Sequence, residues 1–295
     1  MPRARATACC SPSLFTTREA FDRIWTWTRT NLQRKDDFLF SWKWTPENGG
    51  SIGDPNNATD GDLLIAWALL RGFREWNDYK YKQAAGQIVI TVFEKATART
   101  YLGLQLLPGI VGFQKPEGVV LNPSYYVFPA LTELAAAFPS DKWPPLHVGG
   151  LALVQTACFG KWKLSPDWTL VAPSWVTLAP GQDAVFGYNA IRVPLYAAWD
   201  DPASPLLAPF ADFWQSAPAK KWDPATVDLR YDTFGPYEAL PGMMAVRDFT
   251  LACARKTSIT VAAIPALQAE ESYYSASLKL LAKMAIHERF APKRN

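Results

Sequence analysis

The spacing of apolar residues is the feature that most limits how this chain can fold. Apolar side chains recur every three to four residues over long segments, and sustained alternation of apolar and polar residues is almost absent. Loops rich in Pro, Gly and Asn separate these segments. The pattern predicts an all-α fold. The predicted helices are residues 17–33, 60–77, 80–98, 123–138, 144–158, 188–199, 204–215, 242–254 and 270–287.

Length and composition predict one domain, residues 1–295. A chain of 295 residues with 49% hydrophobic residues can bury a large core, and no shift in composition divides it. Two long connections, residues 41–59 and 159–187, contain several tryptophans, and long ordered loops are usually functional. Helices of similar length that alternate with loops are typical of a helical barrel or bundle, in which ligands bind at the loop end.

The charge balance argues against a polyanionic partner. The 30 basic and 27 acidic residues leave a net charge of +3, which is not the basic field that nucleic acid binding requires. We therefore expect no nucleic acid partner. We also expect no membrane span, because no apolar run approaches the roughly 18 to 20 residues that cross a bilayer. The N-terminus lacks the apolar region of a signal peptide.

Metal and cofactor chemistry are not expected. The four cysteines match no zinc-binding spacing, and only two histidines are present. We expect free thiols and structural or surface histidines. These residues are Cys9, Cys10, Cys158, Cys253, His147 and His287.

Aromatic residues make up 14% of the chain, with 13 Trp, 11 Tyr and 16 Phe. Most of these rings are expected to pack in the core. Several lie beside polar residues and prolines, as in FSWKW and SPDW, where a flat ring face can lie against a sugar. The composition thus gives a weak indication of carbohydrate binding.

The stretch NNATDGDLLIAWALLRGFREW, residues 56–76, places two carboxylates at the start of an otherwise apolar helix. Exposed N–H groups and the helix dipole favour acids in a first turn, so this effect alone can explain Asp60 and Asp62. Asn57 or Thr59 is expected to be the N-cap residue, because either side chain can accept a first-turn N–H.

This stretch resembles the signature of glycoside hydrolase family 8, in which Ala, Ser or Thr, Asp, Ala or Gly, and Asp precede an Ile-Ala step and a Trp. Gly72 departs from the signature, which prefers Ala there. The segments LLPGIVGF, LNPSYYVFPAL, PDW and YNAIRVPLYAAW follow in the order seen in bacterial cellulases of this family, particularly those associated with cellulose synthesis. The resemblance extends from about Arg18 to the C-terminus.

The resemblance implies an (α/α)6 barrel of six inner and six outer helices, and hydrolysis of β-1,4-glucan with inversion at the anomeric carbon. Inversion needs one carboxylic acid that protonates the leaving oxygen and a carboxylate about 6.5 to 9.5 Å away that activates water. By resemblance, Asp60 lies in the substrate cleft and holds the distorted sugar beside the scissile bond. Asp62 is expected to be a structural acid that satisfies first-turn N–H groups.

The general acid of the family is the Glu of a motif similar to SEGQGYGM, which precedes a segment like REAFDRIWTWTRTNLQ, residues 18–33. In this chain MPRARATACCSPSLF takes that place, and no glutamate precedes Glu19. We interpret residues 1–15 as non-native sequence from a frameshift or a mistaken start. The first barrel helix and any secretion signal are expected to be missing with the acid.

The residue that activates water also departs from the usual pattern. Many family members carry Asp in a YDAIR segment, whereas this chain has Asn189 in GYNAIR. A carboxamide is no base, although it can orient a water or bond a sugar hydroxyl. Asp183 is the nearest replacement along the chain, although a loop acid is often simply solvated. Asp167 and Asp228 are lesser candidates.

The remaining candidate residues are expected to bind substrate. Tyr125, Trp168 and Tyr188 are expected to contact glucan by stacking and hydroxyl hydrogen bonds, each ring contributing about 1 kcal/mol. Trp42, with Trp44, is expected in the same cleft.

Three further residues are expected to be structural. Arg192 follows Asn189 by three residues and so lies on nearly the same helical face. It is expected to partner an inner-helix acid, with donation to a sugar as the alternative. Trp25 and Trp27 are expected in the core, because they lie inside an amphipathic helix.

Two functions stay open at this point. The first is an inverting endo-β-1,4-glucanase that acts on cellulose and cello-oligosaccharides. The second is a glucan-binding pseudoenzyme that has lost its proton donor. Chitosan and xylan remain possible substrates. By resemblance we expect a monomer, export to the periplasm or secretion, and a functional link to a cellulose synthase system.

The frameshift interpretation predicts what the gene encodes one base out of frame. Residues Met1 to Pro12 can be encoded by synonymous codons that, when read one base out of frame, encode AEGQGYGMLLA. This string is close to the missing motif. Sequencing the gene and the DNA upstream of Met1 is expected to recover this string. Codons that cannot spell it in the shifted frame would show the interpretation to be wrong.

Overall fold

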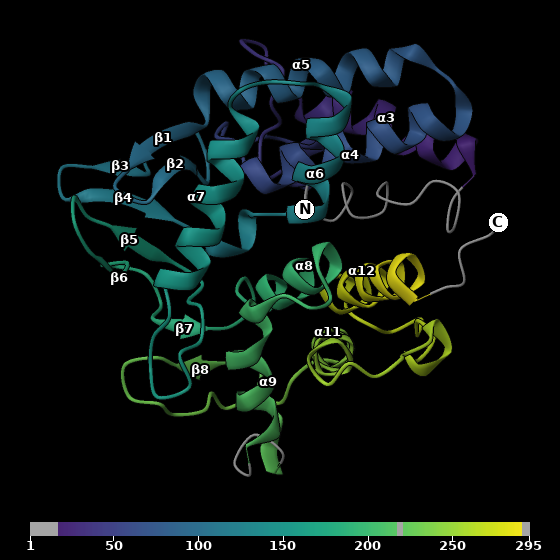
Figure 1. The fold of residues 1–295 in the computed structure, drawn as a ribbon. Coiled ribbons are helices and arrows are strands. Elements are labelled where there is room, and N and C mark those ends of the chain that lie inside the picture. Colours follow the sequence, from purple (N-terminus) through teal and green to yellow (C-terminus); the bar gives the residue numbers. More distant parts are fainter. Residues whose placement is uncertain (1–16, 217–220, 291–295) are drawn as a thin grey trace. The chain divides into compact units, whose positions relative to one another are not determined.

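The computed structural model describes residues 17–216 and 221–290, so the predicted non-native segment 1–15 lies outside the described residues. The chain divides into two compact units. Unit 1 contains the residues up to 121 together with 130–150, and unit 2 contains residues 122–129 together with those from 151 onward. The boundary runs through helices α6 (Phe128–Ala137) and α7 (Trp143–Thr156). Most of the regular structure is helical (Figure 1).

The interior helix of unit 1 is α4. Every residue from Thr59 to Leu70 is buried, whereas a surface helix buries only one stripe. The helix ends at Asn77, which adopts the left-handed conformation with φ 52°. Helix α5 begins two residues later and packs along α4 as an antiparallel neighbour. The helices of unit 1 outside α6 and α7 are α3 (Arg18–Leu32), η1 (Glu47–Gly49), α4 (Thr59–Trp76) and α5 (Tyr79–Lys95).

Unit 2 is built around helix α11, which packs against α8, α9 and α12. Helix α8 is buried from Arg192 to Trp199. Its end is tied to α12, because the Trp199 indole donates to a carboxylate oxygen of Glu288 at 2.8 Å. The helices of unit 2 outside α6 and α7 are η2 (Pro123–Tyr125), α8 (Arg192–Asp200), η3 (Pro205–Leu207), α9 (Ala208–Gln215), α11 (Pro241–Ala254), η4 (Val261–Ala263) and α12 (Tyr273–Phe290).

Short strands occupy several of the predicted loops, so the all-α prediction holds for the helices and is incomplete for the connections. Each strand has only two to four residues, which is too few for an alternating pattern to stand out in the sequence. β1–β2, β3–β4, β5–β6 and β7–β8 pair antiparallel. The strands are β1 (Thr97–Thr100), β2 (Gly103–Leu106), β3 (Gln114–Lys115), β4 (Gly118–Leu121), β5 (Thr169–Val171), β6 (Val176–Leu178), β7 (Val185–Phe186) and β8 (Val227–Asp228).

Three predicted helices differ from the observed ones. The segments 123–138 and 204–215 are each split into a 3₁₀ turn followed by an α-helix. Both 3₁₀ turns start with a proline, whose fixed φ and missing N–H favour the first position of a new helix. The segment 188–199 becomes α-helical only at Arg192, because residues 187–191 form a turn.

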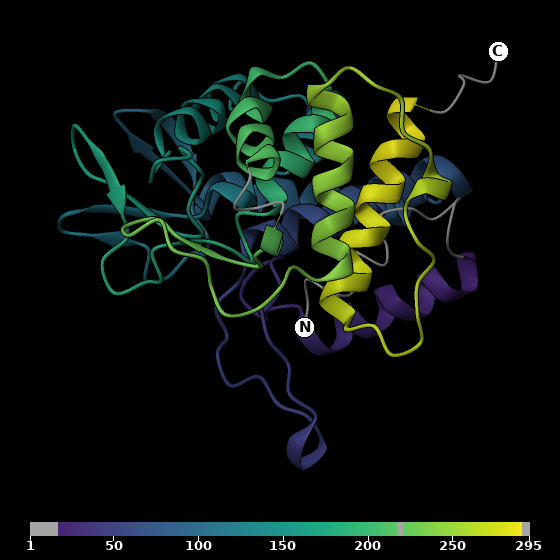
Figure 2. The same ribbon diagram turned by 90° about the horizontal axis from the view of Figure 1, so that it is seen from below.

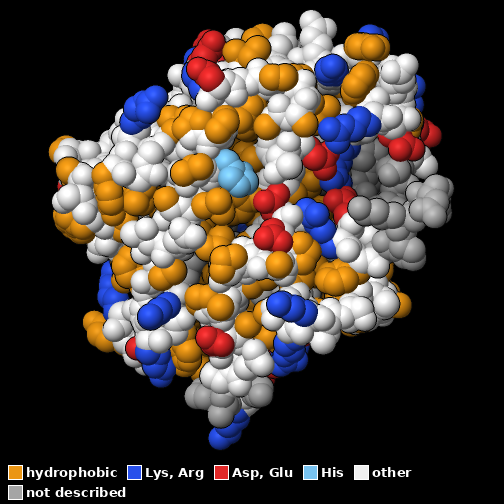
Figure 3. All heavy atoms as spheres, in the orientation of Figure 1, with side chains coloured by type: hydrophobic (Ala, Val, Ile, Leu, Met, Phe, Trp, Pro, Cys, Tyr) orange, Lys and Arg blue, Asp and Glu red, His pale blue; other side chains and the backbone are white. Residues whose placement is uncertain are grey.

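The surface of the described chain has mixed charge. Figure 3 shows Lys and Arg side chains scattered among acidic and apolar ones over the face drawn, rather than gathered in one basic area. None of the helices in the described ranges combines the length and the hydropathy that a membrane crossing requires.

A close backbone approach at Gly149 fixes α7 against β2 within unit 1. Buried Gln105 donates from Nε2 to the carbonyl oxygen of Gly149 at 3.0 Å. A Cβ added at Gly149 would lie 2.1 Å from the backbone oxygen of Leu104. Only glycine can therefore occupy this position without a shift of the backbone.

We predict that Gly149→Ala lowers the free energy of unfolding by about 2 kcal/mol, the scale of overpacking in a close-packed interior. Urea denaturation is the measurement. The matched control is Gly61→Ala, because a Cβ at Gly61 meets no atom within 4 Å and alanine favours a helix by about 1 kcal/mol over glycine. Equal unfolding free energies for the two variants would contradict the prediction.

Candidate active site

Asp60 lies in the first turn of α4 and is 1% exposed. Its Oδ1 accepts a hydrogen bond from the N–H of Gly61 at 2.9 Å. The N-cap residue is Ala58, whose side chain makes no capping bond. The prediction that Asn57 or Thr59 caps the helix is therefore wrong, and the carboxylate of Asp60 contacts a first-turn N–H in place of a cap.

Asp62 is fully buried and holds a preceding loop against the start of α4. One carboxylate oxygen accepts from the N–H of Phe40 at 2.8 Å, and the other accepts from Nδ2 of Asn57 at 2.7 Å. Asn57 in turn accepts from the N–H of Ile110 at 2.8 Å. Asp62 is thus a structural acid, as predicted, but its partners come from other segments and not from the first turn.

The environment of Asp62 disfavours its charge. Burial raises the pKa of its carboxyl to about 8, against the hydrogen bonds from Asn57 and Phe40, which lower it. The nearby carboxylates of Asp60 and Asp37 raise the pKa further. The folded chain therefore keeps Asp62 largely protonated at neutral pH.

Trp42 presents an indole face to solvent from the loop that follows α3. The side chain is 40% exposed, and its Nε1 donates to Oδ2 of Asp54 at 2.7 Å. Hydrogen bonds from Asn56 and from Trp42 itself lower the pKa of Asp54, so the partner is ionised. An exposed ring that is already held in one orientation suits stacking against a sugar.

Trp44 anchors the same loop. Its ring meets that of Trp27 edge-on, with centroids 5.1 Å apart. Gly50 has a positive φ of 96°, and a Cβ there would lie 2.3 Å from the Trp44 ring. Figure 2 shows the loop, in dark blue, extending from the helices as a long arm. Trp42 and Trp44 therefore differ in role, because only Trp42 is exposed.

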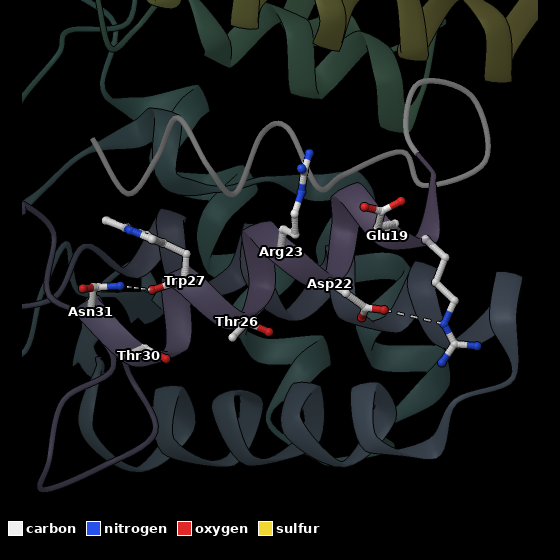
Figure 4. A pocket seen from close by; sticks show the side chains of 8 residues that line it. Glu19, Asp22, Arg23, Thr26, Trp27, Thr30 and Asn31 are labelled. Atoms are coloured by element: carbon white, nitrogen blue, oxygen red, sulfur yellow. Dashed lines mark hydrogen bonds and ion pairs between the residues drawn. The ribbon is translucent and has the colours of Figure 1, made fainter.

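A hollow of about 750 Å³ borders one face of α3. Figure 4 shows its lining side chains, among them Trp27, whose carbonyl oxygen accepts from Nδ2 of Asn31 at 2.8 Å. Trp25 and Trp27 were both expected in the core, and both are half-buried. Trp25 packs on Phe40 with centroids 5.9 Å apart, whereas Trp27 borders the hollow.

In unit 2, Asp167 organises the turn that leads into α8. Its Oδ1 accepts from the N–H groups of Gly187, Asn189 and Ala190 at 3.1, 3.1 and 2.7 Å. Its Oδ2 accepts from Nδ2 of Asn189 at 3.3 Å. The side chain of Asp167 acts like an N-cap residue. Its carboxylate accepts hydrogen bonds from several backbone N–H groups of the turn.

Arg192 is buried, being 8% exposed. Its guanidinium donates to the hydroxyl of Ser124 at 2.8 Å and to Oδ1 of Asn189 at 3.1 Å. Both of these hydrogen-bond acceptors are neutral groups. Its charge still lowers the pKa of Asp167.

The three aromatic residues predicted to bind glucan differ in exposure. Tyr188 is 42% exposed, Trp168 is half-buried and Tyr125 is only 3% exposed. Tyr125 and Trp168 lie together, with ring centroids 6.2 Å apart. Burial leaves Tyr125 little ring surface for stacking, so a direct contact with substrate would be through its hydroxyl.

Tyr274 is a residue that the sequence did not single out. Its ring meets that of Tyr188 edge-on at 5.5 Å, and its hydroxyl donates to the carbonyl oxygen of Tyr188 at 2.7 Å. Burial raises the pKa of Tyr274. In the sequence, only its position in SYYS beside a second tyrosine marked Tyr274 as a possible site residue. Its contact with Tyr188 could not be predicted, because 86 residues separate the two.

The other candidate bases lie in different surroundings. Asp183 is exposed in the loop between β6 and β7. Asp228 accepts from the N–H groups of Arg230 and Tyr231 at 2.8 and 3.0 Å, as expected of a turn acid. Asp167, by contrast, is hydrogen-bonded to the side chain of Asn189.

The described residues offer acids, amides and aromatic rings, which suit proton transfer and carbohydrate contacts. Within ranges 17–216 and 221–290, no group of three or more His, Cys, Asp or Glu side chains could hold a metal ion. Cys158 and Cys253 are free thiols. Cys9 and Cys10 fall outside the described part of the chain.

Comparison with known proteins connects these residues to one family. Residues 9–288 match the model for the glycosyl hydrolases family 8. The chain is 39% identical over 269 residues to a probable endoglucanase of Novacetimonas hansenii, which covers 90% of this chain and 77% of that protein. It is 40% identical over 236 residues to an endoglucanase of Cellulomonas uda, and this alignment covers 79% of this chain and 65% of that protein.

A solved structure shows a similar fold. The endoglucanase Cel10 of Klebsiella pneumoniae, a family 8 glycosyl hydrolase, superposes with a TM-score of 0.90 and 34% identity. The superposition covers 98% of this chain and 91% of that one.

The raised pKa of Asp62 predicts a pH-dependent stability. In the unfolded chain the carboxyl titrates near its ordinary value of about 4, whereas in the folded chain it titrates at about 8. Between these values the folded state binds more protons, so the free energy of unfolding falls as pH rises, by at most about 1.4 kcal/mol per pH unit. Asp62→Asn removes this contribution.

Urea denaturation at several pH values between about 5 and 8 measures the slope. The control is Asp36→Asn, which removes an exposed carboxylate of the same unit and is expected to keep the slope. An Asp62→Asn variant whose stability falls with pH as steeply as that of the parent chain would contradict the assignment.

Proposed function

Because the chain belongs to the glycosyl hydrolases of family 8, we propose that it is an endo-β-1,4-glucanase that cleaves cellulose-type β-glucan with inversion. The observation that carries this proposal is the 39% identity to a probable endoglucanase over 90% of the chain. The agreement with the Cel10 structure over 98% of the chain supports it. Cellulose and cello-oligosaccharides are the proposed substrates.

Asp60 is the proposed residue that binds the sugar next to the scissile bond. It stands at the matching position of the family signature, at the start of a helix that is buried all round. The carboxylate oxygens of Asp60 can accept hydrogen bonds from sugar hydroxyls, and such bonds strengthen as the ring distorts.

Exposed aromatic rings are the proposed contacts along the glucan. Trp42 in unit 1 and Tyr188 in unit 2 are exposed, and Trp168 is half-buried. Each contact is expected to contribute about 1 kcal/mol. Tyr125 and Arg192 are buried, so we assign them to hydrogen bonding or to structural support within unit 2, rather than to stacking.

The proposal also includes the barrel architecture, the oligomeric state, the cellular location and the base. The family implies an (α/α)6 barrel that forms one catalytic domain over residues 1–295. We propose a monomer exported to the periplasm or secreted, with a functional link to a cellulose synthase system. For the base, proximity along the chain suggests Asp183 and the hydrogen bond to Asn189 suggests Asp167, with Asn189 orienting the water in either case.

The 295-residue polypeptide lacks a glutamate before Glu19, where the family signature carries its general acid. We propose that this polypeptide binds glucan but turns over natural substrates slowly. General acid catalysis typically contributes about 100-fold or more. A glucan-binding pseudoenzyme is the second candidate function, and the lack of a glutamate among residues 1–18 is the feature that favours it.

Two measurements on the 295-residue polypeptide test this proposal. Isothermal titration calorimetry with cellopentaose is expected to show binding at millimolar concentration or below. Reducing-sugar release from carboxymethylcellulose is expected to be at least about 100-fold slower than for the chain whose first residues are replaced by the restored-frame sequence. Restoration supplies the proton donor and leaves the rest of the chain unchanged.

The possible results separate the two functions. Recovery of activity in the restored-frame chain supports the hydrolase. A restored-frame chain that binds cellopentaose and stays inactive supports the pseudoenzyme. Absence of cellopentaose binding in both chains would overturn the proposed substrate class.

A further inference from the structure

The residue that stands where many relatives carry a carboxylate, Asn189, is hydrogen-bonded to a carboxylate from a different segment. Asp167 lies 22 residues earlier in the chain and is 6% exposed. Its Oδ1 is fully engaged by three backbone N–H groups. The negative charge missing from position 189 is therefore present in the adjacent side chain.

The orientation of the Asn189 amide is determined by its neighbours. Nδ2 donates to Asp167, and Oδ1 accepts from the Arg192 guanidinium at 3.1 Å. The reversed amide would set an oxygen against a carboxylate and an NH₂ group against a guanidinium, and both contacts are repulsive. Asn189 is thus held as a fixed donor and acceptor beside Asp167.

The second oxygen of Asp167 has capacity for another hydrogen bond. A carboxylate oxygen accepts about two hydrogen bonds, and Oδ2 accepts one, at 3.3 Å from Nδ2 of Asn189. Gly187 borders this oxygen, and a Cβ at Gly187 would lie 3.4 Å from it. Because residue 187 is a glycine, no side chain from this position lies against Oδ2.

The surroundings of Asp167 also suit a base. Burial raises the pKa of its carboxyl, while hydrogen bonds from Ala190 and Asn189 and the charge of Arg192 lower it. Tyr274 lies close enough that the charge of Asp167 contributes to the raised pKa of its phenol, together with Tyr188 and Tyr196. A carboxylate whose pKa lies above its ordinary value accepts a proton more readily near neutral pH.

Resting on the proposed function, we propose that Asp167 accepts the proton of the attacking water, and that Asn189 orients this water. In this step an O–H bond of the water breaks as its proton goes to Oδ2 of Asp167. The oxygen of the water forms a bond to the anomeric carbon, and the bond to the leaving group breaks with its electron pair. Asp167 and Asn189 together then replace the single aspartate of many relatives.

An activated substrate tests this step without the general acid. The fluoride of β-cellobiosyl fluoride leaves without protonation, so its hydrolysis by the 295-residue chain depends on activation of the water alone. Asp167→Asn is expected to lower the rate at least about 100-fold. The remaining amide oxygen can still accept the three backbone N–H groups, although the hydrogen bond from Nδ2 of Asn189 is lost, so rescue experiments are needed to separate a base from a structural role. Asp212→Asn, an exposed site on α9, is the control and is expected to keep the parent rate.

Two rescues distinguish a base from a structural role. Azide carries its own negative charge and needs no base, so it is expected to restore the rate of Asp167→Asn and to form α-cellobiosyl azide. The double variant Asp167→Asn with Asn189→Asp exchanges amide and carboxylate, keeps a hydrogen bond between them, and is expected to regain at least about 10-fold over Asp167→Asn. A merely structural defect would not respond to azide, whereas the exchange variant reports whether a carboxylate at position 189 can act in place of Asp167.

Each contrary result has a defined meaning. An Asp167→Asn variant with the parent rate, or loss of the rate in Asp183→Asn alone, would overturn the role of Asp167. A slow variant that neither azide nor the exchange rescues would reduce Asp167 to a structural acid. If the parent chain neither binds cellopentaose nor hydrolyses the fluoride, the proposed function itself fails.

Discussion

Burying a carboxylate is costly unless N–H groups surround it, and this constraint shapes the start of α4 and the turn before α8. Asp62 draws in the N–H of Phe40 and the amide of Asn57, so a distant loop is held at the helix start. Asp167 collects the N–H groups of three residues in the turn 187–190. In both units the residues assigned to catalysis lie next to such an acid.

Because of this arrangement, position 189 can carry an uncharged asparagine in place of an aspartate without loss of local order. Asp167 fixes the backbone of the turn through Oδ1, independently of the side chain at 189. An aspartate at 189 would place a second charge near Oδ2, whereas asparagine donates a hydrogen bond to it. Like charges at such a distance raise the pKa of one partner strongly. The Asp-Asn pair avoids that repulsion.

The sequence was sufficient for features that depend on neighbours along the chain. Most of the helices and the place of Asp60 in the first turn of α4 follow from local spacing. The strands were not predicted, because each is too short to show alternation. The bond from Phe40 to Asp62 and the contact of Asp167 with Asn189 were not predicted either, because each joins residues 22 positions apart and depends on tertiary packing. The N-cap position of Ala58 could not be predicted, because its side chain makes no capping hydrogen bond.

The aromatic residues show the same division. A high count of rings indicates stacking surfaces, but only the folded chain separates an exposed, fixed ring such as Trp42 from a buried one such as Tyr125. The hydrogen bonds from buried Arg192 to Ser124 and Asn189 are likewise visible only in the folded chain.

The stereochemistry of hydrolysis tests the central claim most directly. Proton NMR of β-cellobiosyl fluoride hydrolysis records which anomer of cellobiose forms first. An inverting family 8 hydrolase gives the α-anomer before mutarotation, because water attacks from the face opposite the leaving group. First formation of the β-anomer, or hydrolysis no faster than without the protein, would contradict the account.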